Sequence, residues 1–125
     1  MKVHARLTQG PLAELTESPY TQGSGARIVF DGVVRPTEDG AEIMGLHYEA
    51  YRPMAEQQLK AIGLELLERH GLIAMHIEHS IGFVPNSECS FRLLIDSKHR
   101  KEGLLAMDEF INRLKQDVPI WKSAK

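Results

Sequence analysis

The sequence contains two pairs of segments in which apolar residues alternate with polar ones, and this arrangement is the strongest constraint on the fold. The first pair covers residues 26–34 and 43–51, and the second covers residues 72–84 and 88–96. A period of two is typical of β-strands, and the polar residues between the members of each pair are typical of turns. Each pair therefore predicts an antiparallel hairpin.

A helical pattern of apolar residues follows each of these pairs. Pro53 opens the first predicted helix, and Gly71 supplies a left-handed residue that ends it. The second is expected to begin at a cap formed by Asp96 or Ser97 and to end at Pro119, which cannot continue a helix. The apolar stripe of the second helix consists of Leu104, Met107, Ile111 and Leu114.

Two shorter patterns precede the first pair of strands. Residues 2–8 alternate and predict an opening strand, whereas residues 11–17 predict one or two helical turns with Pro11 in the first position. The complete order predicts the α+β class, with an antiparallel sheet that carries its helices on one side as a two-layer sandwich. A chain of 125 residues is expected to form one domain, residues 1–125.

Composition narrows the functional classes. A net charge of −2 argues against a general nucleic-acid binder, which would carry a basic excess. No apolar run approaches the roughly 20 residues that span a bilayer, and the polar start does not resemble a signal peptide, so we expect a cytoplasmic protein that is not bound to a membrane. Cys89 is the only cysteine, and we expect it to be a small core residue.

Cationic side chains stand at the ends of the predicted elements. Arg35 ends a strand beside a proline, where its planar guanidinium could bind a phosphate or carboxylate; the alternative is a solvated loop arginine. Lys98, His99, Arg100 and Lys101 start the last helix. Basic residues there oppose the helix dipole unless an anion binds, so this turn indicates either an anion site or a solvated basic turn.

Two lysines lie at the other end of the last helix. Lys115 has an adequate structural explanation, since the helix dipole favours lysine near a C-terminus. Lys122 does not, because it follows the apolar residues Ile120 and Trp121. If these pack against the body of the protein they would desolvate Lys122, lower its pKa and make it usable as an acid, base or nucleophile.

The remaining titratable pattern is the HxxH formed by His76 and His79. On a strand these two imidazoles point to opposite faces, so we expect no metal site there, and no cofactor is expected elsewhere.

Several ordered motifs resemble one known family, the large catalytic subunit of molybdopterin synthase, or MoaE. The motifs span about residues 25–122 and are GARIVFDGVVR, LHYEAYRPMAEQQL, IEHSIGFVPNSE, DSKHRKEGLLAMDEFINRLK and VPIWK. The resemblance implies an α/β hammerhead fold and a sulfur transferase that makes the dithiolene of molybdopterin. The sulfur would arrive as a thiocarboxylate on the C-terminus of a small ubiquitin-like (MoaD-like) subunit and pass to cyclic pyranopterin monophosphate in two rounds.

The resemblance also implies roles for residues. Lys122 and Lys115 match the catalytic lysines of the family, and Arg35, His99 and Arg100 match its phosphate pocket. Arg35 is expected to reach this pocket from the second subunit of a homodimer, and two small subunits would complete a heterotetramer.

Departures from the family pattern leave alternatives open. Family members carry arginine where this chain has Ser80, a different turn where it has residues 86–88, and about twenty more residues after the lysine that Lys122 matches. We therefore also expect that the tail could be supplied by another chain, or that the protein binds pterin or the small subunit without catalysis. A generic α+β interaction domain is a further alternative, which would leave the SKHRK and VPIWK motifs unexplained.

Overall fold

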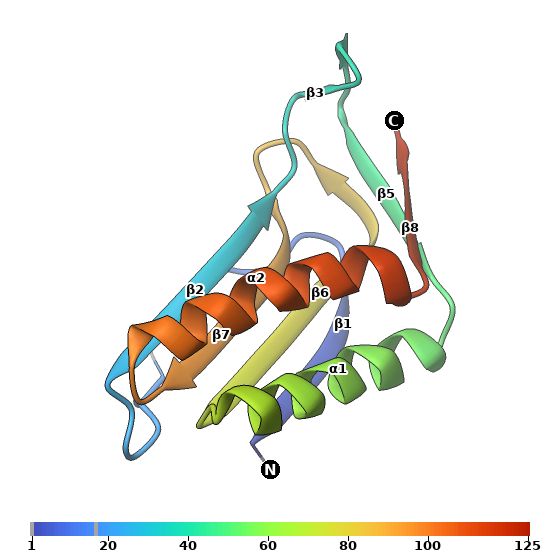
Figure 1. Ribbon diagram of the computed structural model, residues 1–125. Helices are drawn as coiled ribbons and strands as arrows, with labels where there is room; N and C mark the ends of the chain where they lie inside the picture. The colour runs from blue at the N-terminus through green and yellow to red at the C-terminus, as the bar shows by residue number, and fades with distance from the viewer. Residues whose placement is uncertain (1, 17) are drawn as a thin grey trace.

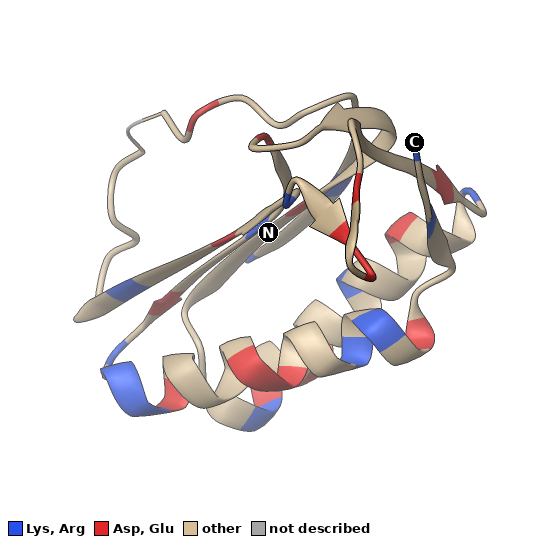
Figure 2. Ribbon diagram, turned by 90° about the horizontal axis from the view of Figure 1, so that it is seen from above, with Lys and Arg blue, Asp and Glu red and all other residues tan. Residues whose placement is uncertain are grey.

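The computed structural model describes residues 2–16 and 18–125 as a bent sheet with two helices on one side (Figure 1). The six strands of the sheet are β1 (Val3–Gln9), β2 (Ala26–Val33), β5 (Gly45–Ala50), β6 (Ala74–Pro85), β7 (Cys89–Ser97) and β8 (Ile120–Ala124). The helices are α1 (Met54–His70) and α2 (Arg100–Asp117), and a separate small hairpin consists of β3 (Thr37–Glu38) and β4 (Ala41–Glu42). Figure 2 shows both helices below the sheet. The predicted α+β class is confirmed.

The long strand β6 organises the sheet, whose order is β2-β7-β6-β5-β8. One edge of β6 pairs with β7 in antiparallel fashion. The other edge is divided, because its residues 75–81 pair with β1 and its residues 82–85 pair with β5. A single strand of twelve residues thus links the main body of the sheet to the smaller β5–β8 part.

The second predicted hairpin, β6–β7, is confirmed, but the first does not form as predicted. β2 pairs with β7 in antiparallel fashion, and β5 lies beyond β6. The connection between β2 and β5 contains its own hairpin, β3–β4, and is long enough to carry the chain to the other part of the sheet. Two cross-strand ion pairs, Arg27–Asp96 and Asp31–Arg92, fasten β2 to β7.

The N-terminal region also departs from expectation. The opening strand β1 is present, but it pairs with β6 in parallel. Residues 11–16 form no helix, and Glu17, the last residue of that prediction, lies outside the described residues. The physical reason is that β7 takes the polar groups of this segment: the Leu12 N–H donates to the Cys89 carbonyl at 2.9 Å, and the Arg92 guanidinium donates to the Ala13 carbonyl at 2.6 Å.

The core lies between the sheet and the helices. Its fully buried large side chains include Leu59, Ile62, Leu66, Met75, Leu93, Ile95 and Phe110. Phe110 stacks on Phe91 with ring centroids 6.3 Å apart, which joins α2 to β7. In α2 the buried face is formed by residues 103, 106, 107 and 110, so Leu104, expected in the apolar stripe, is exposed. The predicted ends of α1 are confirmed, with Gly71 in the left-handed region at φ 65°.

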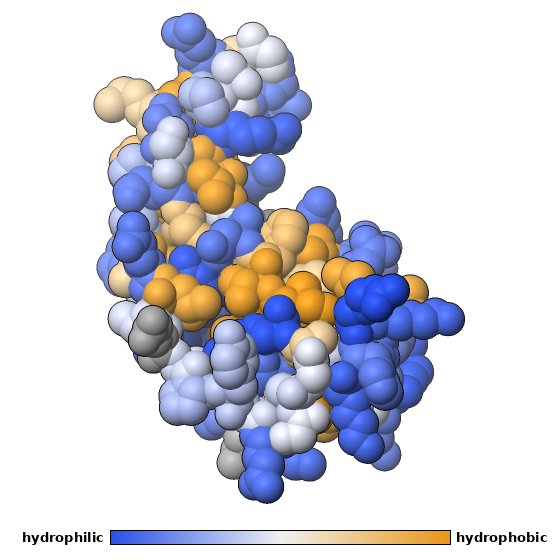
Figure 3. Space-filling model, turned by 90° about the vertical axis from the view of Figure 1, so that its left-hand side faces the viewer, coloured by the Kyte–Doolittle hydropathy of each residue, from blue (hydrophilic) through white to orange (hydrophobic). Residues whose placement is uncertain are grey.

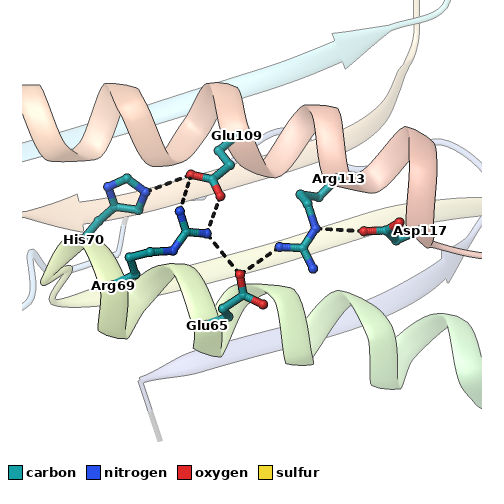
Figure 4. A network of polar contacts seen from close by, with 6 residues as sticks. All are labelled: Glu65, Arg69, His70, Glu109, Arg113 and Asp117. Atoms are coloured by element: carbon teal, nitrogen blue, oxygen red, sulfur yellow. Dashed lines mark hydrogen bonds and ion pairs between the residues drawn. The ribbon is translucent and has the colours of Figure 1, made fainter.

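A network of charged side chains connects the outer surfaces of the two helices (Figure 4). Arg69 of α1 binds Glu65 on its own helix and Glu109 on α2, and Arg113 of α2 binds Glu65 and Asp117. These guanidinium groups lower the pKa values of the Glu65 and Glu109 carboxyls through hydrogen bonds. Because the pairs are largely exposed, each adds little stability, but together they link the two antiparallel helices.

Two surface properties concern possible partners. Within the described residues, neither helix is long and apolar enough to cross a membrane. The edge strand β2 exposes Val29, Phe30 and Val33, and Figure 3, which looks onto this side of the molecule, shows an apolar band across its middle. No described strand covers the outer edge of β2.

Candidate functional site

Four of the five predicted site residues lie at or just beyond the two ends of α2, where Figure 2 shows clusters of Lys and Arg, and Arg35 lies in the connection from β2 to β3. Arg100 begins the helix and Lys115 lies in its last turn. Fifteen residues of α-helix separate them, which corresponds to about 22 Å along the axis. One copy of the chain therefore does not bring all five candidate residues together, and we refer to the two regions as the start and finish ends of α2.

Lys122 lies beyond the finish end, on strand β8. This strand pairs with β5, which places Lys122 opposite Tyr48. Residues two apart share a face of a strand, so Lys122 is on the face of Ile120, which packs against the core. The Lys122 Nζ lies 3.5 Å from Glu38 Oε1 of β3, and its side chain is 53% exposed. The lysine is thus directed inward across the sheet edge but is not desolvated as the sequence suggested.

Of the two apolar residues that precede Lys122, Ile120 packs against the core but Trp121 does not. Val118 is buried, and the main chain is held by hydrogen bonds from the Tyr51 N–H to the Pro119 carbonyl and from the Met44 N–H to the Lys125 carbonyl. Trp121, however, is 60% exposed, because it points to the opposite face of β8. Strand pairing and Val118, rather than the tryptophan, hold the segment in place.

Arg35 lies at the start of the connection between β2 and β3. Glu38, the residue that pairs with Lys122, belongs to β3. The residue before it, Val34, is buried and makes two main-chain bonds with the β6–β7 turn, from the Val34 N–H to the Glu88 carbonyl and from the Ser87 N–H to the Val34 carbonyl. The Arg35 side chain is exposed. The backbone next to Arg35 is therefore fixed, while the Arg35 side chain is exposed and accessible to a ligand.

His99 and Arg100 project from the start end. His99 occupies the N-cap position of α2, with an extended backbone, and its side chain is 79% exposed. The predicted caps Asp96 and Ser97 are wrong, because the Asp96 carboxylate binds Arg27 of β2 and the Ser97 hydroxyl donates to the His99 carbonyl. The Glu102 carboxylate, 3.4 Å from His99 Nδ1, lies against the backbone at this end, and hydrogen bonds from main-chain N–H groups lower its pKa.

The other sequence candidates have structural roles. His79 is buried edge-on against Tyr48 and bonded to the Ser80 carbonyl, and burial lowers its pKa. His76 stacks on His4 with ring centroids 4.9 Å apart. Cys89 is partly buried, and burial raises the pKa of its thiol. Among residues 2–16 and 18–125, no three His, Cys, Asp or Glu side chains gather as metal ligands.

A groove of about 580 Å³ lies away from both ends of α2. It is lined on the sheet by His4, Arg6, His76 and Arg92 and is bordered by Leu15, Thr16 and Ser18. The charged groups there are largely occupied, since Arg6 binds Glu78 and Arg92 binds Asp31. None of the five candidate residues lines it.

Sequence reasoning missed two features near the candidate residues. One is the partner of Lys122, Glu38, which belongs to a turn that reads only as polar. The other is the buried pair Arg27–Asp96 beside the start end. The sequence indicated this pair by an arginine and an aspartate within otherwise apolar strands. Charged residues of these types are seldom buried unless they are paired.

The fold and the two cationic ends of α2 define this chain as a two-layer α+β protein with charged groups presented from one helix and one edge strand. The family model described as "MoaE protein" matches residues 4–117, and the chain belongs to this MoaE family.

Curated relatives share the family. The molybdopterin synthase catalytic subunit of Taeniopygia guttata is 37% identical over 118 residues, which cover 94% of this chain and 74% of that protein. The molybdopterin synthase catalytic subunit of Staphylococcus carnosus (strain TM300) is 41% identical over 109 residues, covering 87% of this chain and 71% of that protein. The chain spans 57% of the corresponding Rattus norvegicus protein, so some relatives are considerably longer.

Solved structures agree with this assignment. Molybdopterin synthase from Staphylococcus aureus superposes with a TM-score of 0.78 at 40% identity, covering 84% of this chain and 77% of that chain. The complex of subunits 1 and 2 of molybdopterin-converting factor from Helicobacter pylori 26695 gives a TM-score of 0.75 at 25% identity, covering 96% of this chain and 83% of that chain.

Proposed function

We propose that this chain is the catalytic subunit of a molybdopterin synthase and that residues 1–125 act as one unit. It would transfer sulfur from the thiocarboxylated C-terminus of a small ubiquitin-like subunit to cyclic pyranopterin monophosphate. Membership of the MoaE family supports the reaction class. The observation that carries the proposal is the placement of Lys122, which is fixed in a strand, directed inward and reachable from solvent.

The lysines and the cationic residues take different parts in the proposed reaction. Lys122 holds or activates the thiocarboxylate, either as an ion-pair partner that exchanges Glu38 for the incoming tail or through a transient amide bond to it. In the second case the lysine amine displaces the sulfur, which stays on the pterin, from the carbonyl carbon of the tail, and water then hydrolyses the amide. Lys115 assists proton transfer at the pterin. Arg35, His99 and Arg100 neutralise the phosphate, and such preorganised cations stabilise charge that develops in the transition state.

A homodimer is part of this proposal. The distance of about 22 Å between Arg100 and Lys115 means that a second copy would have to supply one of the two groups. The uncovered edge of β2 with its exposed Val29, Phe30 and Val33 is a surface of the kind that a second chain covers. In this arrangement each site combines the finish end of one α2 with the start end of the other, and a small subunit at each site makes a heterotetramer.

We place the reaction in the cytoplasm. With Cys89 alone, the chain needs no disulfide that an oxidising compartment would supply, and the sulfur arrives on the partner.

The test is conversion of cyclic pyranopterin monophosphate by the purified protein and a thiocarboxylated small subunit, followed as dithiolene formation. The Lys122→Ala variant should lose turnover by at least about a hundredfold, since one electrostatic or nucleophilic group commonly contributes that much. The molar mass of its assembly, measured by light scattering, should remain that of wild type. Lys125→Ala, which removes an exposed lysine from the same chain end, is the matched control and should remain active. Activity retained in Lys122→Ala would refute the assignment of this lysine.

A further inference from the structure

A buried cluster of polar side chains supports the start end of α2, and none of these side chains has a part in the proposed reaction. We call this cluster the brace. We infer that Arg27, through Asp96, is a positioning residue that orients the turn from which His99 and Arg100 project. This inference rests on the proposed function, because it assigns the brace to the phosphate-binding part of that site.

The centre of the cluster is the Asp96 carboxylate, whose side chain is only 1% exposed. Arg27 binds it through two nitrogens, with Nε donating to Oδ1 at 2.7 Å and Nη2 donating to Oδ2 at 2.9 Å. The Thr21 hydroxyl donates to Oδ2 at 2.7 Å. A bidentate pair of this kind fixes direction as well as distance, so the last residues of β7 cannot rotate independently of β2.

The guanidinium of Arg27 is itself held on its other side. It donates to the carbonyl oxygens of Ser18 and Pro19 at 3.0 and 3.1 Å, and it lies 4.6 Å above the centre of the Tyr20 ring. The guanidinium is thus held by hydrogen bonds along its edge and by the Tyr20 ring on one face.

The brace continues directly into the turn. The Gly25 N–H donates to the Ser97 carbonyl at 2.9 Å, and the Ser97 hydroxyl donates to the His99 carbonyl at 2.6 Å. At Gly25 a Cβ would overlap the Lys98 carbonyl, and at Gly103 a Cβ would lie 2.8 Å from the Ser97 hydroxyl oxygen. The chain therefore approaches the turn so closely from both sides that only glycine fits without displacing it.

His99 and Arg100 depend on this backbone for their direction, because both side chains are exposed and, in the part of the chain that the structure describes, the one ion pair that either makes is that of His99 with Glu102. Displacement of a ligand-binding group by about 1 Å can cost up to a hundredfold in rate or binding. A rigid turn beneath exposed cations is thus a means of holding them ready for an anion without burying them.

The same two strands contain a matched control. Asp31 and Arg92 form the second cross-strand pair of β2 and β7, with Arg92 Nε donating to Asp31 Oδ1 at 2.5 Å. This pair joins the same two residue types through the single nitrogen Arg92 Nε and lies four residues from Arg27 and from Asp96, on the side away from the turn. Its loss should affect the sheet but not His99 and Arg100.

The experiment compares Arg27→Lys and Ser97→Ala with Arg92→Lys. Arg27→Lys keeps the charge but loses the bidentate geometry, and Ser97→Ala removes one bond of the turn with little change in volume. In steady-state conversion, both should lower kcat/KM for cyclic pyranopterin monophosphate about tenfold, and most of this loss should be a rise in KM, because the phosphate is bound in the ground state as well as in the transition state. Arg92→Lys should leave KM unchanged.

Backbone amide NMR shifts provide a readout that does not require turnover. Arg27→Lys and Ser97→Ala should shift the His99 and Arg100 amide signals, whereas Arg92→Lys should leave them in place. Unshifted signals in both turn variants, or equal shifts in Arg92→Lys, would overturn the inference even if the protein converts its substrate. Shifted signals in a protein that has no conversion activity would instead support the brace and reject the proposed function.

Discussion

The two ends of α2 carry the same kind of charge but are built in opposite ways. At the start end, exposed His99 and Arg100 stand on a turn that is fixed by the buried Asp96 and Ser97. At the finish end, the helix passes through buried Val118 into β8, an edge strand held to β5 by main-chain pairing. Within residues 2–16 and 18–125, the one ion-pair partner of Lys122 is Glu38.

The difference corresponds to the two kinds of ligand in the proposed reaction. A small rigid anion is bound best by cations whose positions are set beforehand, since little ordering then remains to be done on binding. The tail of a partner protein must instead enter a site, and an edge strand with an accessible lysine leaves room for it. The comparison predicts that substitutions at the start end affect folding strongly and that those at the finish end affect chemistry with little effect on folding.

The largest effect on stability is expected for Asp96→Ala. This change removes the carboxylate that Arg27 and Thr21 share and leaves the Arg27 guanidinium, 15% exposed, without its charge partner. Breaking a buried ion pair by removing one member costs about 3–5 kcal/mol. Urea denaturation should show this loss as a lower midpoint.

Asp31→Ala is the comparison variant, since its side chain is 43% exposed and its loss should be smaller. Equal losses for the two variants would contradict a special role of the start end.

Acid should also act on the start end. Hydrogen bonds from Arg27 and Thr21 hold the pKa of Asp96 below its ordinary value of about 3.9. A carboxyl whose pKa is lower in the folded state contributes stability that is fully present above its unfolded pKa and is lost as the pH falls through its folded pKa. Wild type should therefore lose free energy of unfolding below about pH 4 more steeply than Asp96→Asn.

The other carboxyls described with lowered pKa values, Glu65, Glu102 and Glu109, remain in both proteins and cancel in this comparison. Parallel curves for wild type and Asp96→Asn below pH 4 would show that Asp96 is not the group responsible.

The same two ends show what could be predicted from the sequence. The helices and strands were predictable because the spacing of apolar residues in β6, β7 and both helices matches the residues that are buried in one core. Pro53, Gly71 and Pro119 mark the helix ends. The pairing of β2 with β7 was not, since strand periodicity does not specify a neighbour. The parallel pairing of β1 has the same cause.

The candidate residues were predicted by type and place, but their surroundings were not. Asp96 reads as a helix cap because it precedes a helix, and only the structure shows that Arg27, 69 positions earlier, binds it. Trp121 reads as an anchor because tryptophan is usually buried, but the pairing of β8 with β5 turns it outward. Contacts distant in sequence decided each of these outcomes.

The smallest effect on stability is expected at the finish end, for Trp121→Ala. Removing the only tryptophan of a small protein would ordinarily be costly, since burying an aromatic ring stabilises a core by several kcal/mol. Here the ring is 60% exposed and lies on the face of β8 turned away from the core, so the free energy of unfolding should change by no more than about 0.5 kcal/mol. Val118→Ala, three residues earlier and buried, should cost more than Trp121→Ala in the same urea titration. If Trp121→Ala proves the more damaging of the two, the side chain is covered in solution, and the finish end is held by a contact that strand pairing does not provide.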